Sequence, residues 1–173
     1  MFRFLCIFVA CAVGVAAEQD GKGDEAWEKY SPADGGFNVS FPKKPLVKEP
    51  SAATGNLHVA AVQRAAADEL GFICQWKVTD KAFESKEVER AYLKGQQQGM
   101  MKGIKGKLIE EKEITTDGFL GLDFLVQANN MSLRSRSYVS GKRLVTLMVI
   151  GKDVDSVRSE SAKKFLESFK ESK

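Results

Sequence analysis

The sequence has 173 residues, of which 43% are hydrophobic and 28% charged, and its formal net charge is +3. This balance is typical of a globular chain and excludes a disordered one. A charge this small, without a basic tail or a basic stripe interleaved with aromatic residues, argues against nucleic-acid binding. The length suits one domain of ordinary size.

The first 17 residues have the three parts of a secretory signal. Arg3 gives a positive start, residues 4–17 are apolar, and Val15-Ala16-Ala17 places small residues where a signal peptidase cleaves. The apolar run is shorter than the roughly 18 residues that a transmembrane helix needs. We therefore expect cleavage near Ala17, export to the periplasm or the extracellular space, and no transmembrane segment in the mature chain. A lipoprotein modified at Cys11 and an uncleaved anchor are the alternatives.

Cleavage would leave Cys74 as the only cysteine, because Cys6 and Cys11 lie in the removed run. No intramolecular disulfide is then possible, so the mature chain must be held together by its core. Two Asn-x-Ser triplets, at Asn38 and Asn130, matter only in a eukaryotic secretory pathway, and we interpret them as chance occurrences.

After the signal we expect a polar, mobile leader at 18–26 and a single domain at 27–173. Residues 37–41 alternate between apolar and polar, which indicates a half-buried strand, and the proline-containing residues 42–54 are predicted to be a loop. A strand is expected within 57–67, although the alanine run from Ala65 also suits a helix. Residues 72–78 alternate again and predict another strand.

One helix is expected from Asp80 to about Met101, where apolar residues recur at near-helical spacing: Phe83, Val88, Ala91 and Tyr92. Either Asp80 or Ser85 is predicted to cap its start. Gly95 and Gly99 weaken the helix by about 1 kcal/mol each relative to alanine, so a late break is an open alternative.

The second half predicts a meander of strands joined by hairpin-length turns. An edge-like, mostly charged strand at 107–115 is followed by strands at 120–128 and 132–139. The next strand, Arg143 to Gly151, contains seven successive apolar or β-branched residues. Because neighbouring side chains alternate between faces and neither face is polar, both faces of this strand must be covered.

A C-terminal helix is predicted from about Asp155 to Phe169, with Asp153 or Asp155 as its cap. Its apolar stripe consists of Val157, Phe165, Leu166 and Phe169. Two helices and one two-sided sheet predict an α+β fold. We expect an α/β/α sandwich with a mainly antiparallel sheet of about six or seven strands and a helix on each face.

Three segments carry a resemblance to known proteins: Trp27…Tyr30-Ser31-Pro32…Gly35-Gly36-Phe37-Asn38-Val39-Ser40-Phe41-Pro42, Arg134-x-Arg136-x-Tyr138-Val139…Arg143-Leu144…Gly151, and Phe165-Leu166-Glu167-Ser168-Phe169-Lys170. Over 27–170 the chain resembles small exported bacterial proteins of unknown function and, more distantly, PsbP-like domains. The resemblance implies an α/β/α sandwich with an antiparallel sheet. It also implies a non-catalytic role in assembling or stabilising a larger complex or in binding a partner, and it supplies no active site.

The sequence offers little catalytic or metal-binding chemistry. His58 is the only histidine and no Gly-x-Ser-x-Gly elbow is present, so we interpret it as an ordinary strand residue. With Cys74 as the one mature thiol, the four ligands of a zinc site cannot be assembled from cysteine and histidine. Cys74 lies on the same strand face as Phe72, Trp76 and Val78, which predicts a buried thiol. The glycine-rich segment 99–106 lacks Walker spacing. We expect no enzyme activity, no cofactor and no metal.

Two groups of residues are candidates for contact with a partner. No carboxylate occurs from Arg90 through Ile109, whereas four lysines do: Lys94, Lys102, Lys105 and Lys107. These lysines either bind an anionic partner, such as an acidic protein or phospholipid headgroups, or form a solvated charged face. The second group, on one strand face, is Arg134, Arg136 and Tyr138. Its arginines either meet a ligand or pair across the sheet with Glu110, Asp123 or a neighbour of Lys112.

The sequence therefore favours an exported, non-catalytic binding or assembly protein of the cell envelope or extracellular space. Its expected partner is an unknown envelope or extracellular protein or an anionic surface, and we expect a monomer. The alternative is a carrier of a small ligand or lipid, with a pocket between sheet and helix.

Overall fold

The structure, a computed structural model, describes residues 27–33, 35–48, 50, 56–63 and 70–172. The predicted signal at 1–17 with its cleavage site at Ala17, the predicted leader at 18–26 and the alanine run from Ala65 lie outside the described residues.

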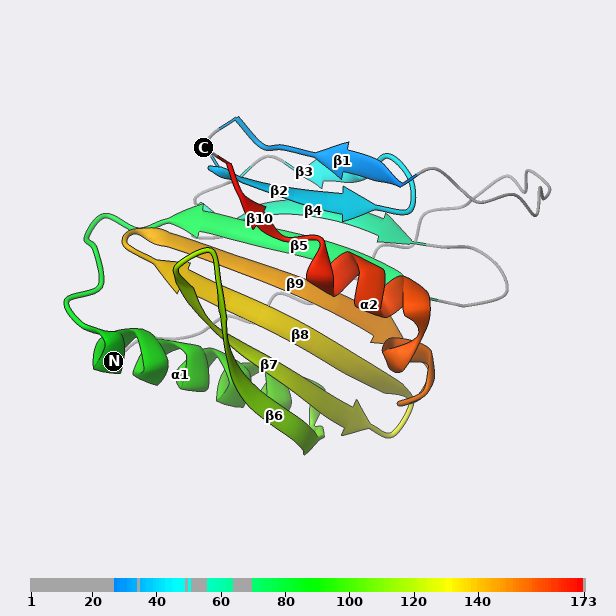
Figure 1. Cartoon of the computed structure of the whole chain (residues 1–173). Helices are drawn as coiled ribbons and strands as arrows, with labels where there is room; N and C mark the ends of the chain where they lie inside the picture. The colour runs from blue at the N-terminus through cyan, green and yellow to red at the C-terminus, as the bar shows by residue number, and fades with distance from the viewer. Residues whose placement is uncertain (1–26, 34, 49, 51–55, 64–69, 173) are drawn as a thin grey trace.

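Seven strands form the main sheet, and every neighbouring pair is antiparallel. In spatial order they are β3 (Leu46–Lys48), β4 (His58–Gln63), β5 (Gly71–Val78), β9 (Arg143–Gly151), β8 (Met131–Ser140), β7 (Phe119–Ala128) and β6 (Lys107–Thr116) (Figure 1). The predicted meander is present as β6, β7, β8 and β9. β9 is the fourth of the seven strands, so it is central, as its uninterrupted apolar run predicted.

The side chains of β9 divide between two cores, one on each side of the sheet. Leu144 and Met148 belong to the core beneath helix α1 (Lys86–Ile104), and we call this the α1 side of the sheet. Val145, Leu147 and Val149 belong to the core on the opposite side, which we call the α2 side. Since both sets are buried, the expectation that both faces are covered is confirmed.

A second sheet of three strands packs on the α2 side, in the order β1 (Glu28–Tyr30), β2 (Phe37–Phe41) and β10 (Lys170–Glu171). β2 occupies the predicted range, and its apolar side chains are buried in the α2-side core. Three strands lie where none was predicted, and the first of them is β1. β3 falls inside the predicted loop at 42–54, which is therefore wrong over Leu46–Lys48, and β10 follows the C-terminal helix.

Helix α1 begins after Ser85, which was one of the two predicted caps. The Ser85 hydroxyl accepts a hydrogen bond from the Val88 amide at 3.4 Å. The helix continues through Gly95 and Gly99 to Ile104, so the late break is not observed. It packs on β7 and β8 through Leu93, which is buried.

The C-terminal helix is shorter than predicted. A 3₁₀ turn at Ser156–Arg158 precedes α2 (Glu160–Glu167), and the extended backbone of Ser159 separates them. The cap of α2 is Ser159, whose hydroxyl accepts from the Ala162 amide. The predicted cap Asp153 lies one turn earlier, where its Oδ1 accepts from the Ser156 amide at 2.8 Å at the start of the 3₁₀ turn. All four predicted stripe residues are nevertheless buried in the α2-side core: Val157, Phe165, Leu166 and Phe169.

Candidate binding surface around helix α1

The residues considered for catalysis are held in packing roles. His58 stacks on Trp76 with ring centroids 4.9 Å apart. Cys74 is a buried free thiol, and burial raises its pKa far above the usual range, which keeps it protonated. Within the described ranges, no three histidine, cysteine, aspartate or glutamate side chains are placed to hold a metal, and no helix is long and apolar enough to span a membrane.

Arg134 and Arg136 pair across the sheet with Asp123 of β7. The guanidinium of Arg134 donates from Nε and Nη2 to the two Asp123 oxygens at 3.1 and 3.2 Å. Arg136 donates from Nε to Asp123 Oδ2 at 2.7 Å and from Nη1 to the Leu166 carbonyl at the end of α2. Burial opposes the charge of Arg136, but the Asp123 hydrogen bond raises its pKa. Of the two roles the sequence left open, the structure shows the pairing with Asp123.

Tyr138 lies on the same face but is only 2% exposed. Its ring stacks on Phe169 with centroids 4.3 Å apart, and burial raises its pKa. A side chain enclosed in this way cannot meet a surface partner without unfolding its surroundings. We therefore leave Tyr138 out of the proposed contact surface.

The N-terminal half of α1 is neutralised by strand β6. Arg90 donates to the two Glu113 oxygens at 2.9 and 3.2 Å, and Lys94 pairs with Glu111, which also accepts from Gln97 at 2.7 Å. The hydrogen bonds from Lys94 and Gln97 lower the pKa of Glu111, and the hydrogen bond from Arg90 lowers the pKa of Glu113. Lys94 is thus already paired within the chain.

These neighbours of Lys112 were predicted as possible partners of Arg134 and Arg136, and their pairing with α1 was missed because they follow the carboxylate-free segment in sequence. A signal for them exists, however. Glu111 and Glu113 are two residues apart on a strand, so they share a face. The turn that joins α1 to β6 is short, which brings this face beside the helix.

The C-terminal end of α1 keeps its positive charge. Lys102, Lys105 and Lys107 are exposed and form no ion pair within the part of the chain that the structure describes. Lys105 is the C-cap of the helix and has a left-handed backbone, with φ of 52° and ψ of 40°. The next amide, that of Gly106, donates to the Met101 carbonyl at 2.9 Å. Cations here also interact favourably with the negative end of the helix dipole.

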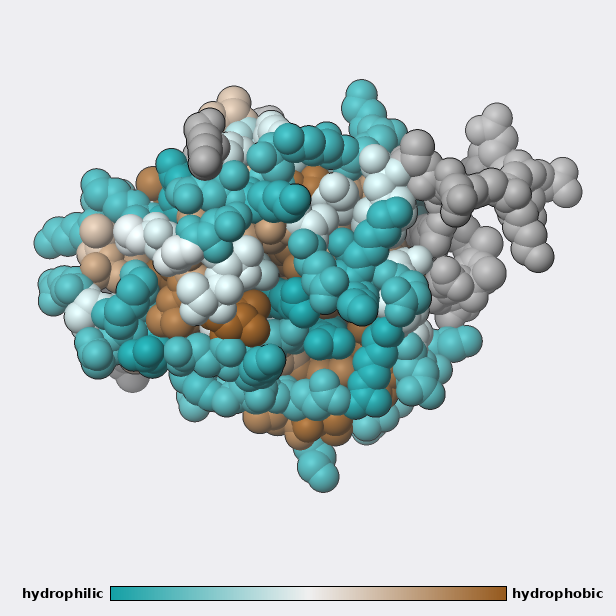
Figure 2. Space-filling model, in the orientation of Figure 1, coloured by the Kyte–Doolittle hydropathy of each residue, from teal (hydrophilic) through white to brown (hydrophobic). Residues whose placement is uncertain are grey.

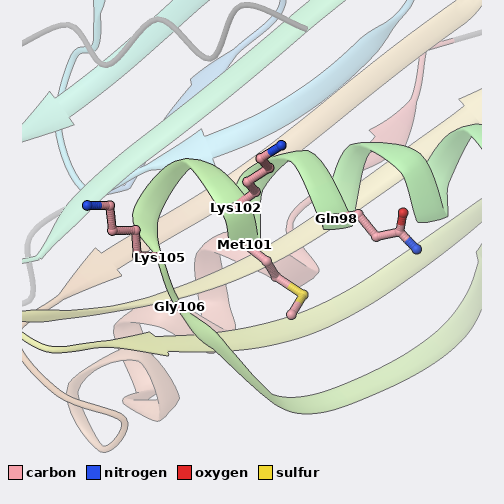
Figure 3. Close-up of a pocket in the computed structure, with 5 residues that line it drawn as sticks. All are labelled: Gln98, Met101, Lys102, Lys105 and Gly106. Carbon is pink, nitrogen blue, oxygen red and sulfur yellow. The ribbon is translucent and has the colours of Figure 1, made fainter.

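A shallow surface depression adjoins these lysines, lined by Gln98, Met101, Lys102, Lys105 and Gly106 (Figure 3). Figure 3 shows Lys102 and Met101 pointing to different sides of the helix, with Lys105 beyond its last turn. Gly106 brings the chain close to β7, since a Cβ there would lie 2.4 Å from Val126 Cγ1. The result is a small apolar floor with a basic rim, and we call Lys102, Lys105 and Lys107 with this depression the basic end of α1.

Packed side chains fill the layer between α1 and the sheet. Leu93 lies against apolar side chains of β7, β8 and β9. Gln96 donates to Thr146 Oγ1 at 2.8 Å, and Thr146 bonds Ser137 at 3.2 Å. This packing does not favour the predicted alternative of a carrier with a pocket between sheet and helix.

The α2 side presents a different surface. Hydrophilic side chains predominate on the face shown in Figure 2, and hydrophobic residues are visible only in separate patches. A second shallow depression there is polar and is lined by Trp27 and residues of α2. Lys164 of α2 is 4.7 Å above the Trp27 ring, so this cation already has a partner within the chain.

The sequence matches no protein-family model and no curated protein. The structure is similar to cyanobacterial PsbP (CyanoP) from Synechocystis sp. PCC 6803, with a TM-score of 0.59 and 14% identity over 90% of this chain and 98% of CyanoP. It is also similar to PA94 from Pseudomonas aeruginosa, a protein of unknown function titled a putative regulator. That match has a TM-score of 0.47 and 14% identity over 80% of this chain and 91% of PA94. At such identities the likeness concerns the fold alone, and the chain has the PsbP-like α+β fold that its sequence resemblance implied.

Proposed function

We propose that the chain is an exported, non-catalytic binding protein that contacts an acidic partner protein of the cell envelope or extracellular space through the basic end of α1. Export is supported by the signal pattern of residues 1–17. The observation that carries the binding proposal is the contrast along α1. Arg90 and Lys94 are paired with β6, whereas Lys102, Lys105 and Lys107 are exposed and unpaired among the described residues.

An acidic protein fits this site better than a membrane surface. Clusters that bind anionic lipids usually contain about four to eight lysines and arginines, each worth about 1 kcal/mol near the surface. The basic end of α1 offers three lysines. It also offers a half-buried methionine, Met101, and adaptable methionine side chains favour protein contacts.

The experiment that tests this proposal is affinity capture from the envelope fraction with the full chain and two variants of equal charge change. The site variant is Lys102→Glu with Lys105→Glu. The matched control is Lys152→Glu with Lys163→Glu, two exposed lysines remote in sequence from α1. We expect an acidic protein to be recovered with the wild-type chain and the control, and its yield to fall by about tenfold with the site variant.

Equal recovery with the site variant would overturn the proposed contact. Vesicles that contain phosphatidylglycerol form a second arm of the experiment. Binding to these vesicles that is lost in the site variant but not in the control would replace the protein partner with a membrane surface. N-terminal sequencing of the exported chain tests the predicted cleavage near Ala17.

A further inference from the structure

The α1 side of the main sheet is covered over only part of its width. α1 packs on β7 and β8, and Figure 1 shows it beside the β6–β8 part of the sheet and away from β3, β4 and β5. The register identifies the side chains that β3–β5 place on this side. Ile73 joins the α1-side core, Ala61 is its partner on β4, and Leu46 is the partner of Ala61 on β3. We call this surface of β3, β4 and β5 the open face.

The open face is accessible and combines apolar side chains with polar ones, because the register also places Lys48, Gln75 and Lys77 on it. Leu46 is 75% exposed, and Val59, Ala61 and Ile73 are half-buried. The exposed Leu46 and the half-buried Ala61 and Ile73 are register partners, so they form one continuous apolar row that another element can cover. Among the described residues, no helix or strand packs on this surface with the extent that α1 shows on β7.

The width of the open face suits one α-helix. Neighbouring strands lie about 4.8 Å apart, so three strands and the gap toward β9 span roughly 10–14 Å. A helix with its side chains is about 10–12 Å across. A helix on β3–β5 would therefore complete the layer that α1 begins.

The charge around the open face specifies the kind of helix. Strands β3, β4 and β5 contain no aspartate or glutamate. Lys77 lies on the open face, since its register partner Leu144 belongs to the α1-side core. Lys102 extends from the last turn of α1 (Figure 3). An occupant with acidic flanks would complement these cations.

The helix that borders the open face permits close approach. Ala91, Gly95, Gly99 and Gly103 recur every four residues and so form one stripe. Gln96 reaches Thr146 of β9, whereas Lys94 and Gln97 reach β6. Gly99 and Gly103 follow Gln96 by three and seven residues, so this end of the stripe lies on the flank turned from β6. A Cβ at Gly95 would meet nothing within 4 Å among the described residues. A helix bound on the open face could therefore lie close to α1.

We propose that the open face binds an amphipathic, acidic α-helix of the partner protein, with apolar residues on Leu46, Ala61 and Ile73 and carboxylates toward Lys77 and Lys102. This inference rests on the proposed function and specifies its partner class. A second copy of the chain suits the surface less well, because two open faces would bring like charges together.

The test uses the full chain and a side-chain-stapled helical peptide of about 20 residues, with leucine along one face and glutamate on its flanks. One control peptide has lysine in place of glutamate, and another has the same composition in an order that abolishes the leucine face. Amide chemical shifts locate the bound peptide. We expect saturable shifts in β3–β5 and in α1 with the acidic helix, and affinity weaker by about tenfold for either control peptide.

Two variants of the chain, each with a matched control, sharpen the test. Leu46→Lys and Lys77→Glu should each weaken binding of the acidic helix by about tenfold. Ile109→Lys and Lys112→Glu, on β6 at the opposite edge of the sheet, should leave the affinity within about twofold. Unchanged amide spectra of the free variants establish that they are folded.

Three results would overturn the inference. They are no saturable binding of the acidic helix to the full chain, equal binding of the control peptide that lacks the leucine face, and self-association of the chain through β3–β5. Self-association through β3–β5 would be recognised in sedimentation experiments as a dimer that Leu46→Lys converts to a monomer. If the peptide fails while envelope capture still depends on Lys102 and Lys105, the proposed function stands and only the helix on the open face is withdrawn.

Discussion

On the α2 side of the seven-stranded sheet, α2 and the three-stranded sheet pack over the strands together, whereas on the α1 side a single helix packs over β7 and β8. The two sides also differ in how far their charged side chains are paired. On the α2 side, Asp123 is shared by Arg134 and Arg136, and Glu110 pairs with Arg158. On the α1 side, the last helix cation with an ion pair among the described residues is Lys94, and the lysines at the end of the helix are exposed.

This difference separates stability from binding. Most of the largest fully buried aromatic side chains lie on the α2 side, where Phe165 and Phe169 contact rings of β2, β5 and β8. Substitutions there should therefore change the free energy of unfolding. Substitutions at the basic end of α1 or on the open face should change binding and leave the fold nearly unaltered.

The largest expected effect is loss of the fold in a chain that ends at Lys164. This truncation removes Phe165, Leu166 and Phe169, each buried in the α2-side core. Their burial contributes about 1.5–3 kcal/mol each, or roughly 5–9 kcal/mol together, against a typical total stability of about 5–15 kcal/mol. Circular dichroism should show no cooperative melt. A chain that ends at Phe169 loses only β10 and should still fold, and an unchanged melt of the shorter chain would contradict this account.

A smaller effect is expected for Asp123→Asn. The variant removes the counter-charge that the partly buried guanidinium groups of Arg134 and Arg136 share and leaves Arg136 only the longer pair with Glu167 at 3.8 Å, which should cost about 1–3 kcal/mol. Urea unfolding measures this change. Glu110→Gln, which breaks the exposed pair with Arg158, is the control and should cost less than about 1 kcal/mol. Equal effects of the two substitutions would show that the Asp123 cluster is no more than a surface pair.

Lys105→Gly should change stability and binding in opposite directions. The left-handed backbone of Lys105 is unfavourable for a residue with a side chain, and glycine removes that strain at some cost in unfolded-state entropy. We expect the free energy of unfolding to rise by about 0.5–1 kcal/mol while partner capture falls. If capture rises with stability, Lys105 acts through the fold and not through contact.

The smallest effect concerns the pH dependence contributed by Glu113. Its pKa is lowered in the folded state from the ordinary 4.5 by the hydrogen bond from Arg90. The stabilisation is therefore fully present above that ordinary pKa and is lost as pH falls through the lowered value. The urea midpoints of the wild-type chain and Glu113→Gln should differ slightly at about pH 7 and converge at about pH 3. A gap that widens on acidification would contradict this sign.

Long, strongly patterned elements were predictable from sequence, because their buried residues recur with the period of a strand or a helix. β9 was recognised by its unbroken apolar run, the β6–β9 meander by its turns, and the C-terminal stripe by its spacing. The interruption of the C-terminal helix at Ser159 was not predicted, because the apolar stripe continues across it and only a serine cap separates the two helical segments.

Features that depend on distant partners were not predictable. β1, β3 and β10 have only two or three residues each, too few for periodicity, and exist because β2 and β4 are beside them. The lysines of the candidate site also could not be sorted from sequence, because their pairing depends on a neighbouring strand. Sequence alone grouped Lys94 with Lys102, and only the packing of β6 along α1 shows that Lys94 is paired, whereas Lys102 has no ion pair in the part of the chain that the structure describes.

The most direct test of the account is photo-crosslinking in the producing cells from one residue on each side of the molecule. A photoreactive side chain at Gln98, exposed beside the basic end of α1, is compared with one at Lys163, exposed on α2. We expect a discrete adduct with an acidic protein from Gln98, abolished by Lys102→Glu with Lys105→Glu, and none from Lys163. An adduct from Lys163 alone, or equal adducts from both positions, would contradict the claim that the α1 side is the binding side.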